Sequence, residues 1–180
     1  MDRATLAGGC FWCTEAIFKR LKGVSEVVSG YAGGVKDNPS YEQVSTGSTG
    51  HAEAIDIEFD PKIISYEKLL EIFFTLHDPT TLNRQGADEG TQYRSAIFYH
   101  NESQKETALT VRDKIADSGI YTDAIITEIV PFESFYAAEE YHQNYYENNR
   151  SQGYCSVVIG PKIAKLLKEY GKEVKEEYKD

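Results

Sequence analysis

The junction between a short strand and a helix near the N-terminus constrains this chain more than any other feature. The apolar run 5–7 leads into Gly8 and Gly9, and the apolar positions after Cys10 recur with the spacing of a helix. These positions are Ile17, Phe18 and Leu21. The pattern predicts that Cys10 lies where a strand passes into the N-terminus of a helix.

The predicted position of Cys10 favours chemical reactivity. Free N–H groups and the positive dipole end of a helix N-terminus stabilise a thiolate over a thiol, which lowers the pKa of a cysteine there. Phe11 and Trp12, the only tryptophan, follow Cys10 directly. Two large aromatic side chains can form an apolar pocket for a small methyl-like group. The stretch therefore predicts a nucleophile beside an apolar pocket.

The length and charge of the chain narrow the class of protein. At 180 residues it can bury a core without disulfide bonds, and we expect one domain over residues 1–160 followed by a charged helix or solvated tail over 161–180. Nineteen Lys and Arg residues against 29 Asp and Glu residues give a net charge of −10. That charge disfavours binding to nucleic acid and to anionic membranes.

The cellular compartment follows from two further patterns. The N-terminus has no apolar segment of signal-peptide length, and no apolar run is long enough to cross a bilayer, so we expect a cytoplasmic protein. The cytosol keeps thiols reduced. The three cysteines are therefore more typical of redox chemistry or of a metal site than of structural disulfides.

Periodicity predicts a mixed set of strands and helices. Strands are expected over 24–31, 55–60, 95–99 and 124–130, and helices over 65–78, 101–119 and 137–144. A long loop or short helix is expected over 33–50, and polar loops are expected over 82–93 and 151–155. The first two segments could meet over one end of the sheet. This order of elements favours a mixed sheet with helices packed on it, in the α+β class.

Cys10 and Cys13 form a Cys-x-x-Cys pair that is compatible with more than one chemistry. The spacing suits a thiol-disulfide oxidoreductase or half of a zinc site. A Cys/His metal-binding module would need further ligands, and the chain offers only Cys155 and four scattered histidines, His51, His77, His100 and His142. Cys155 follows Gly153 and Tyr154 in a predicted loop, where a cysteine can fill space or reach a distant thiol and form a disulfide.

Four polar residues each allow a structural and a functional interpretation. Glu53 either begins a strand on its wet face or, beside an apolar pocket, has a raised pKa and donates a proton. Tyr41 and Tyr93 are either packing residues among 13 tyrosines or hydrogen-bond donors to a substrate. Asp88 is by default a turn residue.

Short motifs along almost the whole chain carry a resemblance to a known family. They are Gly9–Trp12, Gly30–Gly34, Asn38–Tyr41, Gly50–Glu53, His77–Pro79, Gln85–Asp88, Gly90–Ser95, Tyr141–Gln143 and Gly153–Cys155. In this order they closely resemble peptide methionine sulfoxide reductase A. The resemblance implies a ferredoxin-like two-layer α/β plait with a mixed, mainly antiparallel sheet, and makes residues 1–160 a catalytic domain.

The family's chemistry can be carried over to matching positions. The resemblance implies that Cys10 attacks the sulfur of a methionine S-sulfoxide, free or in a protein, while Phe11 and Trp12 hold its methyl group. Glu53 would protonate the departing oxygen. Tyr41 and Tyr93 would hydrogen-bond that oxygen, and Asp88 would line the same pocket.

The same resemblance implies how the enzyme is recycled. Cys10 would be left as a sulfenic acid, Cys155 would condense with it to a disulfide, and thioredoxin would reduce that disulfide. The family uses no metal or organic cofactor, and we expect a monomer. Cys13 departs from the family pattern, which usually has glycine there, and is a possible additional redox residue. The chain also lacks the further C-terminal cysteine of some members.

Overall fold

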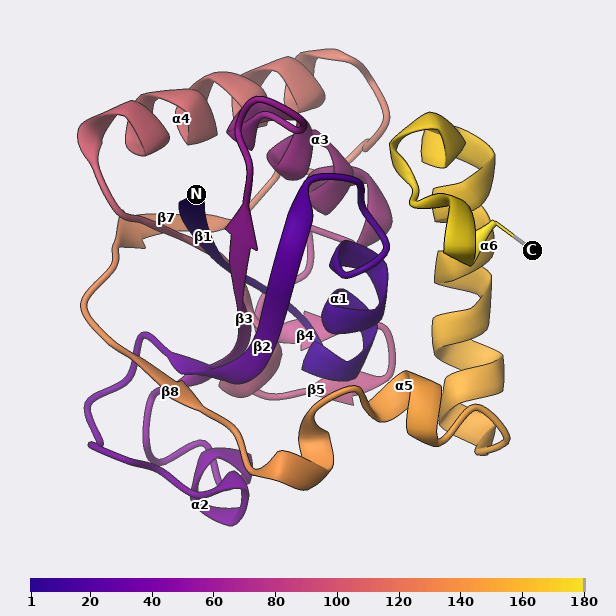
Figure 1. Cartoon of the computed structure of the whole chain (residues 1–180). Helices are drawn as coiled ribbons and strands as arrows, with labels where there is room; N and C mark the ends of the chain where they lie inside the picture. Colours follow the sequence, from indigo (N-terminus) through magenta and orange to yellow (C-terminus); the bar gives the residue numbers. More distant parts are fainter. Residues whose placement is uncertain (180) are drawn as a thin grey trace.

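The computed structural model describes residues 1–179 and is built around one six-stranded sheet (Figure 1). The strand order is β7-β6-β1-β3-β2-β8, and neighbours are antiparallel except for β6 and β7. The strands are β1 (Asp2–Gly8), β2 (Val24–Ala32), β3 (Ala52–Phe59), β6 (Ser95–Tyr99), β7 (Glu128–Pro131) and β8 (Phe135–Ala137). A separate two-stranded hairpin joins β4 (Arg84–Gln85) and β5 (Asp88–Glu89).

Helices complete the α+β architecture that the sequence predicts. The longer ones are α1 (Phe11–Phe18), α3 (Tyr66–Leu76), α4 (Glu102–Asp117) and α6 (Gly160–Tyr170), and the short ones are α2 (Tyr41–Ser45) and α5 (Tyr145–Asn148). Side chains of α1, α3 and α4 join those of β1, β3 and β6 in the main core cluster. In Figure 1, α6 lies beside α1 at the edge opposite the N-terminal end of α4. The mixed, mainly antiparallel sheet is confirmed.

In strand β3 the alternation of apolar and polar residues matches the alternation of buried and exposed side chains. Ile55, Ile57 and Phe59 are fully buried on the helix-covered face, and Glu58 is exposed on the other. Glu53 has the parity of Ile55 and Ile57 and therefore lies on the buried face. The interpretation of Glu53 as the start of a wet face is wrong, because alternation assigns it to the core.

Side-chain caps set the starts of two helices as predicted. The hydroxyl of Ser65 accepts the backbone N–H of Lys68 at 3.0 Å, and α3 follows. The amide oxygen of Asn101 accepts the backbone N–H of Gln104 at 2.9 Å before α4, which ends two residues before Gly119. These local signals work because they depend only on neighbouring residues.

Two predicted elements differ from the structure after residue 120. The strand predicted over 124–130 is shorter and later, because only β7 pairs with β6. The helix predicted over 137–144 does not form. Its residues contribute the end of β8 and a 3₁₀ turn, because the side chain of Gln143 bonds the backbone N–H and C=O of Ser29 on β2.

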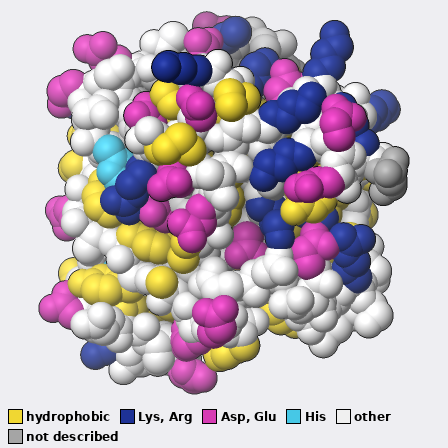
Figure 2. All heavy atoms as spheres, in the orientation of Figure 1, with side chains coloured by type: hydrophobic (Ala, Val, Ile, Leu, Met, Phe, Trp, Pro, Cys, Tyr) yellow, Lys and Arg dark blue, Asp and Glu magenta, His cyan; other side chains and the backbone are white. Residues whose placement is uncertain are grey.

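The C-terminal segment packs on the domain, unlike the solvated tail that its composition suggests. A π-helical turn over Cys155–Ile159 replaces the predicted loop end and continues into α6. Leu166 and Val174 are fully buried, and Val174 forms an isolated bridge with Leu21 at the end of α1. Figure 2 shows Lys and Arg side chains gathered on the side formed by α6 and this segment.

Candidate active site

Cys10 is the N-cap of α1, as the sequence predicts. The chain reaches it through Gly9, whose φ of +92° lies in the left-handed region. A Cβ on Gly9 would lie 2.6 Å from Cγ of Gln85, and Gln85 is itself held by two 2.9 Å hydrogen bonds to the backbone of Asp78. The turn therefore places Cys10, which is 8% exposed, at the edge of a packed site.

The expected low pKa of Cys10 is wrong. Burial raises it well above its usual value, and the hydrogen bond to Cys13 and the charge of Glu53 raise it further, while a backbone hydrogen bond from Trp12 lowers it. Desolvation outweighs the helix dipole here. Cys13 shows the opposite shift, because the hydrogen bond from the Cys10 thiol and the charge of Lys162 lower its pKa to about 7. Of the two thiols, Cys13 therefore ionises first.

Glu53 lies on β3 with its carboxyl at the start of α1. Its Oε1 accepts the backbone N–H of Phe11 at 3.1 Å, and the side chain is 2% exposed. Burial raises its pKa to about 8, helped by the charges of Asp88 and Cys13 and opposed by the Phe11 hydrogen bond. At neutral pH Glu53 therefore carries a proton that it can donate.

Tyr41 and Tyr93 come from two different loops to the surroundings of Glu53. Tyr41 opens α2, and its backbone N–H donates to the carboxylate of Glu139 at 3.0 Å. Tyr93 ends a 3₁₀ turn over Thr91–Tyr93 and packs on the cluster that contains Cys10. Burial, together with the charge of Glu53, raises the pKa of each phenol. Both therefore keep the hydroxyl proton that a hydrogen-bond donor needs.

Asp88 contacts the C-terminal segment and lines a cavity together with Cys10 and Cys13. It lies on β5, and its Oδ2 accepts the hydroxyl of Tyr154 at 2.8 Å. The same hydroxyl is 3.8 Å from Sγ of Cys13. A cavity of about 170 Å³ opens here, lined by Cys10, Cys13, Asp88, Tyr154 and Lys162 among others. Tyr154 thus connects the C-terminal segment to the loop that carries Asp88.

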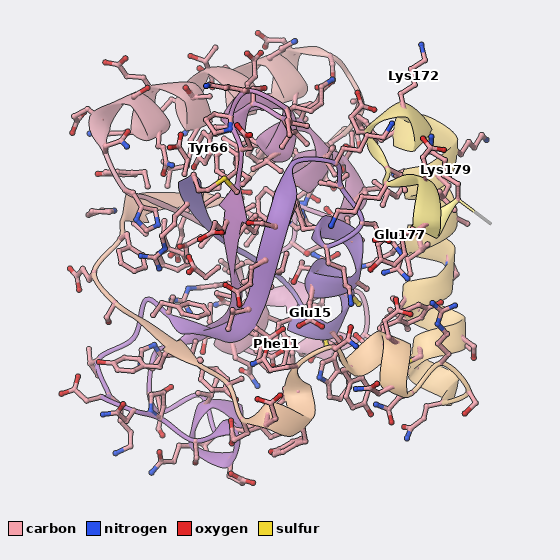
Figure 3. The ribbon with its side chains drawn as sticks, viewed as in Figure 1. Phe11, Glu15, Tyr66, Lys172, Glu177 and Lys179 are labelled. Carbon is pink, nitrogen blue, oxygen red and sulfur yellow. The ribbon has the colours of Figure 1, made fainter. Side chains whose placement is uncertain are left out.

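Phe11 and Trp12 occupy different environments. Phe11 is 1% exposed and packs against Tyr31, so it belongs to the core (Figure 3). Trp12 is half-buried, and its indole stacks on Tyr145 with ring centroids 3.7 Å apart and planes 7° apart. Tyr154 meets the same indole edge-on. Trp12 is therefore the more exposed of the two aromatic side chains that follow Cys10.

Cys155 lies in one cluster with Cys10 and Cys13. It is fully buried at the first position of the π-helical turn, and the mobile loop predicted for it does not form. Burial raises its pKa, and the charge of Cys13 adds to that effect. All three cysteines are free thiols. The fold thus brings together thiols that are more than 140 positions apart in the sequence.

Sequence reasoning found the cysteines, Glu53, the two tyrosines and Asp88, and it missed several of their partners. The missed residues are Gln85, Glu139, His142, Tyr154 and Lys162. All of them except Lys162 lie within or near the family motifs of the sequence, so the motifs could have pointed to them. Lys162 lies on α6, and only its packing against the cavity reveals it.

Residues 1–179 hold neither a cluster of metal-ligating side chains nor a helix suited to span a membrane. No group of three or more His, Cys, Asp or Glu side chains in that range is arranged to hold a metal ion. None of the helices in the same range combines the length and apolarity that a membrane span requires.

Comparison with known proteins gives one consistent result. The family model for peptide methionine sulfoxide reductase matches residues 2–175. Peptide methionine sulfoxide reductase MsrA from Polynucleobacter asymbioticus is 53% identical over 178 residues, which cover 99% of this chain and 94% of that protein.

Solved structures agree with the sequence comparison. Reduced Mxr1 from Saccharomyces cerevisiae superposes with a TM-score of 0.80 at 38% identity, over 86% of this chain and 88% of that one. Mxr1 in complex with Trx2 superposes with a TM-score of 0.58 at 27% identity, over 80% and 84% of the two chains. This chain therefore belongs to the peptide methionine sulfoxide reductase A family.

Proposed function

We propose that this protein reduces the S epimer of methionine sulfoxide, free or within proteins, to methionine. The observation that carries the proposal is the buried carboxyl of Glu53, which accepts the backbone N–H of Phe11 at the start of the helix whose N-cap is Cys10. Burial raises the pKa of this carboxyl to about 8, which favours its protonated form at neutral pH. A thiolate attacks the sulfur of a sulfoxide readily only when the sulfoxide oxygen is protonated or strongly hydrogen-bonded. Glu53 supplies that proton beside the nucleophile.

The reaction at sulfur balances with the groups present. The thiol of Cys10 donates its hydrogen bond to Cys13, so the Cys13 thiolate receives the proton as Cys10 attacks the sulfoxide sulfur. The attack forms a bond between the Cys10 sulfur and the sulfoxide sulfur while Glu53 protonates the oxygen. The S–O bond to methionine then breaks, the released hydroxide attacks the Cys10 sulfur, and the bond between the two sulfurs breaks as methionine leaves. The products are methionine and a sulfenic acid on Cys10, with Cys13 protonated and Glu53 ionised.

The remaining site residues orient the substrate in this proposal. Trp12, backed by Phe11, contacts the methyl group on sulfur. Tyr41 and Tyr93 donate hydrogen bonds to the sulfoxide oxygen, and Asp88 lines the pocket beside them. Fixed places for the methyl group and the oxygen leave one configuration at sulfur that points its lone pair correctly, which gives selectivity for one epimer.

A second thiol then resolves the sulfenic acid. Cys155 attacks the sulfenic sulfur, a disulfide forms and water leaves. Thioredoxin reduces the disulfide by thiol-disulfide exchange, in agreement with the complex between the related Mxr1 and Trx2. Cys13 is a second candidate for this step, because its thiol already exchanges a hydrogen bond with Cys10. We propose a monomer that works in the cytoplasm without a bound cofactor.

The test measures methionine formed from each sulfoxide epimer with dithiothreitol as reductant. The S epimer should be consumed and the R epimer left, and Cys10→Ser should abolish the reaction. Exclusive turnover of the R epimer, or activity that persists in Cys10→Ser, would contradict the proposal. Isothermal unfolding of the variant serves as the control for a folded protein.

The identity of the resolving thiol needs a separate experiment with thioredoxin. Cys155→Ser should release about one methionine per enzyme and then stop. Cys13→Ser should react more slowly, because the acceptor for the Cys10 proton is lost, but should release more than one methionine per enzyme. Full turnover of Cys155→Ser would assign resolution to Cys13. Mass spectrometry of peptides from the oxidised wild-type enzyme identifies the joined cysteines directly.

A thiol-disulfide oxidoreductase is the second candidate function. The observation in its favour is the Cys10–Cys13 hydrogen bond with a Cys13 pKa of about 7, because paired thiols of this kind attack disulfides. This activity would reduce insulin disulfides and would not need Glu53. Unchanged insulin reduction in Glu53→Gln, with no sulfoxide reduction by the wild type, would favour it.

A further inference from the structure

His142 is a buried polar residue that the reaction scheme above does not use. It ends a 3₁₀ turn over Glu140–His142 and is 1% exposed. Its imidazole is surrounded by aromatic rings, with centroids 5.0 Å from Phe11, 4.5 Å from Tyr41 and 4.2 Å from Tyr141. An apolar side chain of similar size would suit these surroundings, so the presence of an imidazole calls for a chemical reason.

The reason lies in the hydrogen bond from Trp12. The indole Nε1–H of Trp12 donates to Nδ1 of His142 at 3.0 Å. An indole nitrogen can only donate, so Nδ1 must carry a lone pair and the imidazole proton must lie on Nε2. Burial also lowers the pKa of His142, which favours the neutral ring. The contact is therefore possible for one tautomer of the neutral histidine.

The other ring nitrogen shows that the bond to Trp12 has priority. Nε2 of His142 is buried and has no hydrogen-bond partner among residues 1–179. A buried donor without an acceptor destabilises a fold, and such groups are uncommon. Rotating the ring to satisfy Nε2 would remove the acceptor for the indole. The ring is thus oriented for Trp12.

The backbone around His142 is fixed on both sides. The carboxylate of Glu139 accepts the hydroxyl of Tyr31 at 2.9 Å and the backbone N–H of Tyr41 at 3.0 Å. Gln143 bonds the backbone N–H and C=O of Ser29, each at 2.9 Å. These bonds hold the segment against β2. His142 therefore has a defined position from which to hold Trp12.

The other side of the indole is held by stacking on Tyr145. Backbone N–H groups of Asn144 and Tyr145 in turn donate to the buried carboxyl of Glu15, which lies one turn along α1 from Phe11 (Figure 3). Stacking restrains the plane of the indole and leaves it free to slide within that plane. The hydrogen bond to His142 removes this freedom, because it fixes the position of Nε1.

We propose that His142 is a positioning residue that fixes the in-plane orientation of Trp12 and thereby shapes the pocket for the methyl group of the substrate. The inference rests on the proposed function, because it assigns a consequence for substrate binding to the Trp12–His142 contact. His142 does not touch the reacting atoms. Its loss weakens the binding of substrate more than it slows the chemistry.

The experiment compares His142→Leu with His142→Asn. Leucine removes the acceptor, whereas the amide oxygen of asparagine lies near the place of Nδ1 and can accept the indole N–H. We expect KM for methionine S-sulfoxide to rise about tenfold in His142→Leu with kcat changed less than about threefold, and His142→Asn to recover most of the loss. In a Trp12→Phe background, which has no indole N–H, His142→Leu should not raise KM further.

A spectroscopic readout tests the contact without activity. Trp12 is the only tryptophan, so the ¹H–¹⁵N spectrum contains one indole signal. That signal should move and its proton should exchange faster in His142→Leu, and it should stay close to the wild-type position in His142→Asn. In the wild type, long-range ¹H–¹⁵N correlations of His142 should show a proton on Nε2 and a lone pair on Nδ1.

Three results would overturn the proposal. They are a wild-type tautomer with the proton on Nδ1, an indole signal unchanged by leucine, and an equal loss of activity in the asparagine and leucine variants. The wild-type tautomer decides the matter even where His142→Leu does not fold. Failure of the proposed function appears differently, as a wild-type enzyme that leaves methionine S-sulfoxide intact while the indole signal behaves as expected.

Discussion

Glu53 and Glu58 lie on the same strand and differ in the face that they occupy. Glu58 points to solvent, while Glu53 is buried where β3 meets the start of α1. The difference follows from the period of two along a strand. Burial keeps the proton on Glu53 at neutral pH, with a pKa of about 8. One strand thus carries both a solvated carboxylate and a neutral acid.

The protonation of Glu53 predicts the alkaline side of the pH profile. Single-turnover reduction of the sulfoxide should decline as the pH rises through about 8, because the donor proton is lost there. Glu53→Gln should lower the rate by about 100-fold or more and should remove this decline. Rapid-quench measurement of methionine across the pH range checks both. A Glu53→Gln profile that keeps the wild-type decline would place the titration on another group.

The same raised pKa predicts how stability depends on pH. Unfolding returns Glu53 from a pKa of about 8 towards 4.5, so the folded state binds the extra proton between these values. The contribution of Glu53 is most favourable below 4.5 and is lost as the pH rises through 8. Glu53→Gln should therefore gain stability relative to the wild type between pH of about 5 and 9, as measured by urea unfolding. A constant difference between the two proteins would contradict the shift.

Elements with strong local signals were predictable from the sequence. The period of two in β3, and the caps Ser65 and Asn101 before α3 and α4, correctly located those elements. The prediction of a helix over 137–144 was wrong, because the conformation of this segment depends on Ser29, which is more than a hundred residues away. The raised pKa of Cys10 was missed for the same reason, since burial depends on the whole fold. The roles of the site residues remain proposals.

The hydrogen bonds between the side chain of Gln143 and the backbone of Ser29 give a prediction at the scale of one element. Gln143→Ala removes the bonds to the backbone N–H and C=O of Ser29 on β2. Leaving these groups without their partner should lower the free energy of unfolding by about 1–3 kcal/mol. Urea unfolding measures the change.

The control for Gln143→Ala is Gln152→Ala. Gln152 is exposed and has only long contacts, of 3.4 Å, to Tyr145 and Asn149. Its replacement should change the free energy of unfolding by less than about 0.5 kcal/mol. Equal effects of the two substitutions would mean that Gln143 does not fasten the segment to β2.

At the scale of the molecule, the C-terminal segment belongs to the packed structure. It places Lys162 at the cavity with Cys10 and carries Val174 back to the end of α1. Positive side chains therefore gather on one side of a chain whose net charge is −10 (Figure 2). In this view Asp and Glu side chains stand among them.

Val174 tests whether the segment stabilises the whole domain. Val174→Ala creates a cavity at a fully buried position beside Leu21 and should lower the free energy of unfolding by about 1–3 kcal/mol. Val157, which is 73% exposed, offers a matched control in Val157→Ala. Two unfolding transitions, or equal midpoints for both variants, would show that the segment unfolds independently.

The residues around the site lie on elements that need different free energies to open. Strand β3 is central in the sheet, whereas the other elements are short and peripheral. Amide hydrogens between β1, β3 and β2 are released only when the sheet itself opens, whereas those of a two-residue strand or a 3₁₀ turn exchange through local fluctuation. Glu53 lies on the first kind of element, and Asp88 and Tyr93 lie on the second. Hydrogen exchange should therefore be slow around Glu53 and fast around Asp88. The segments that carry Asp88 and Tyr93 can then open and close while Glu53 stays in place.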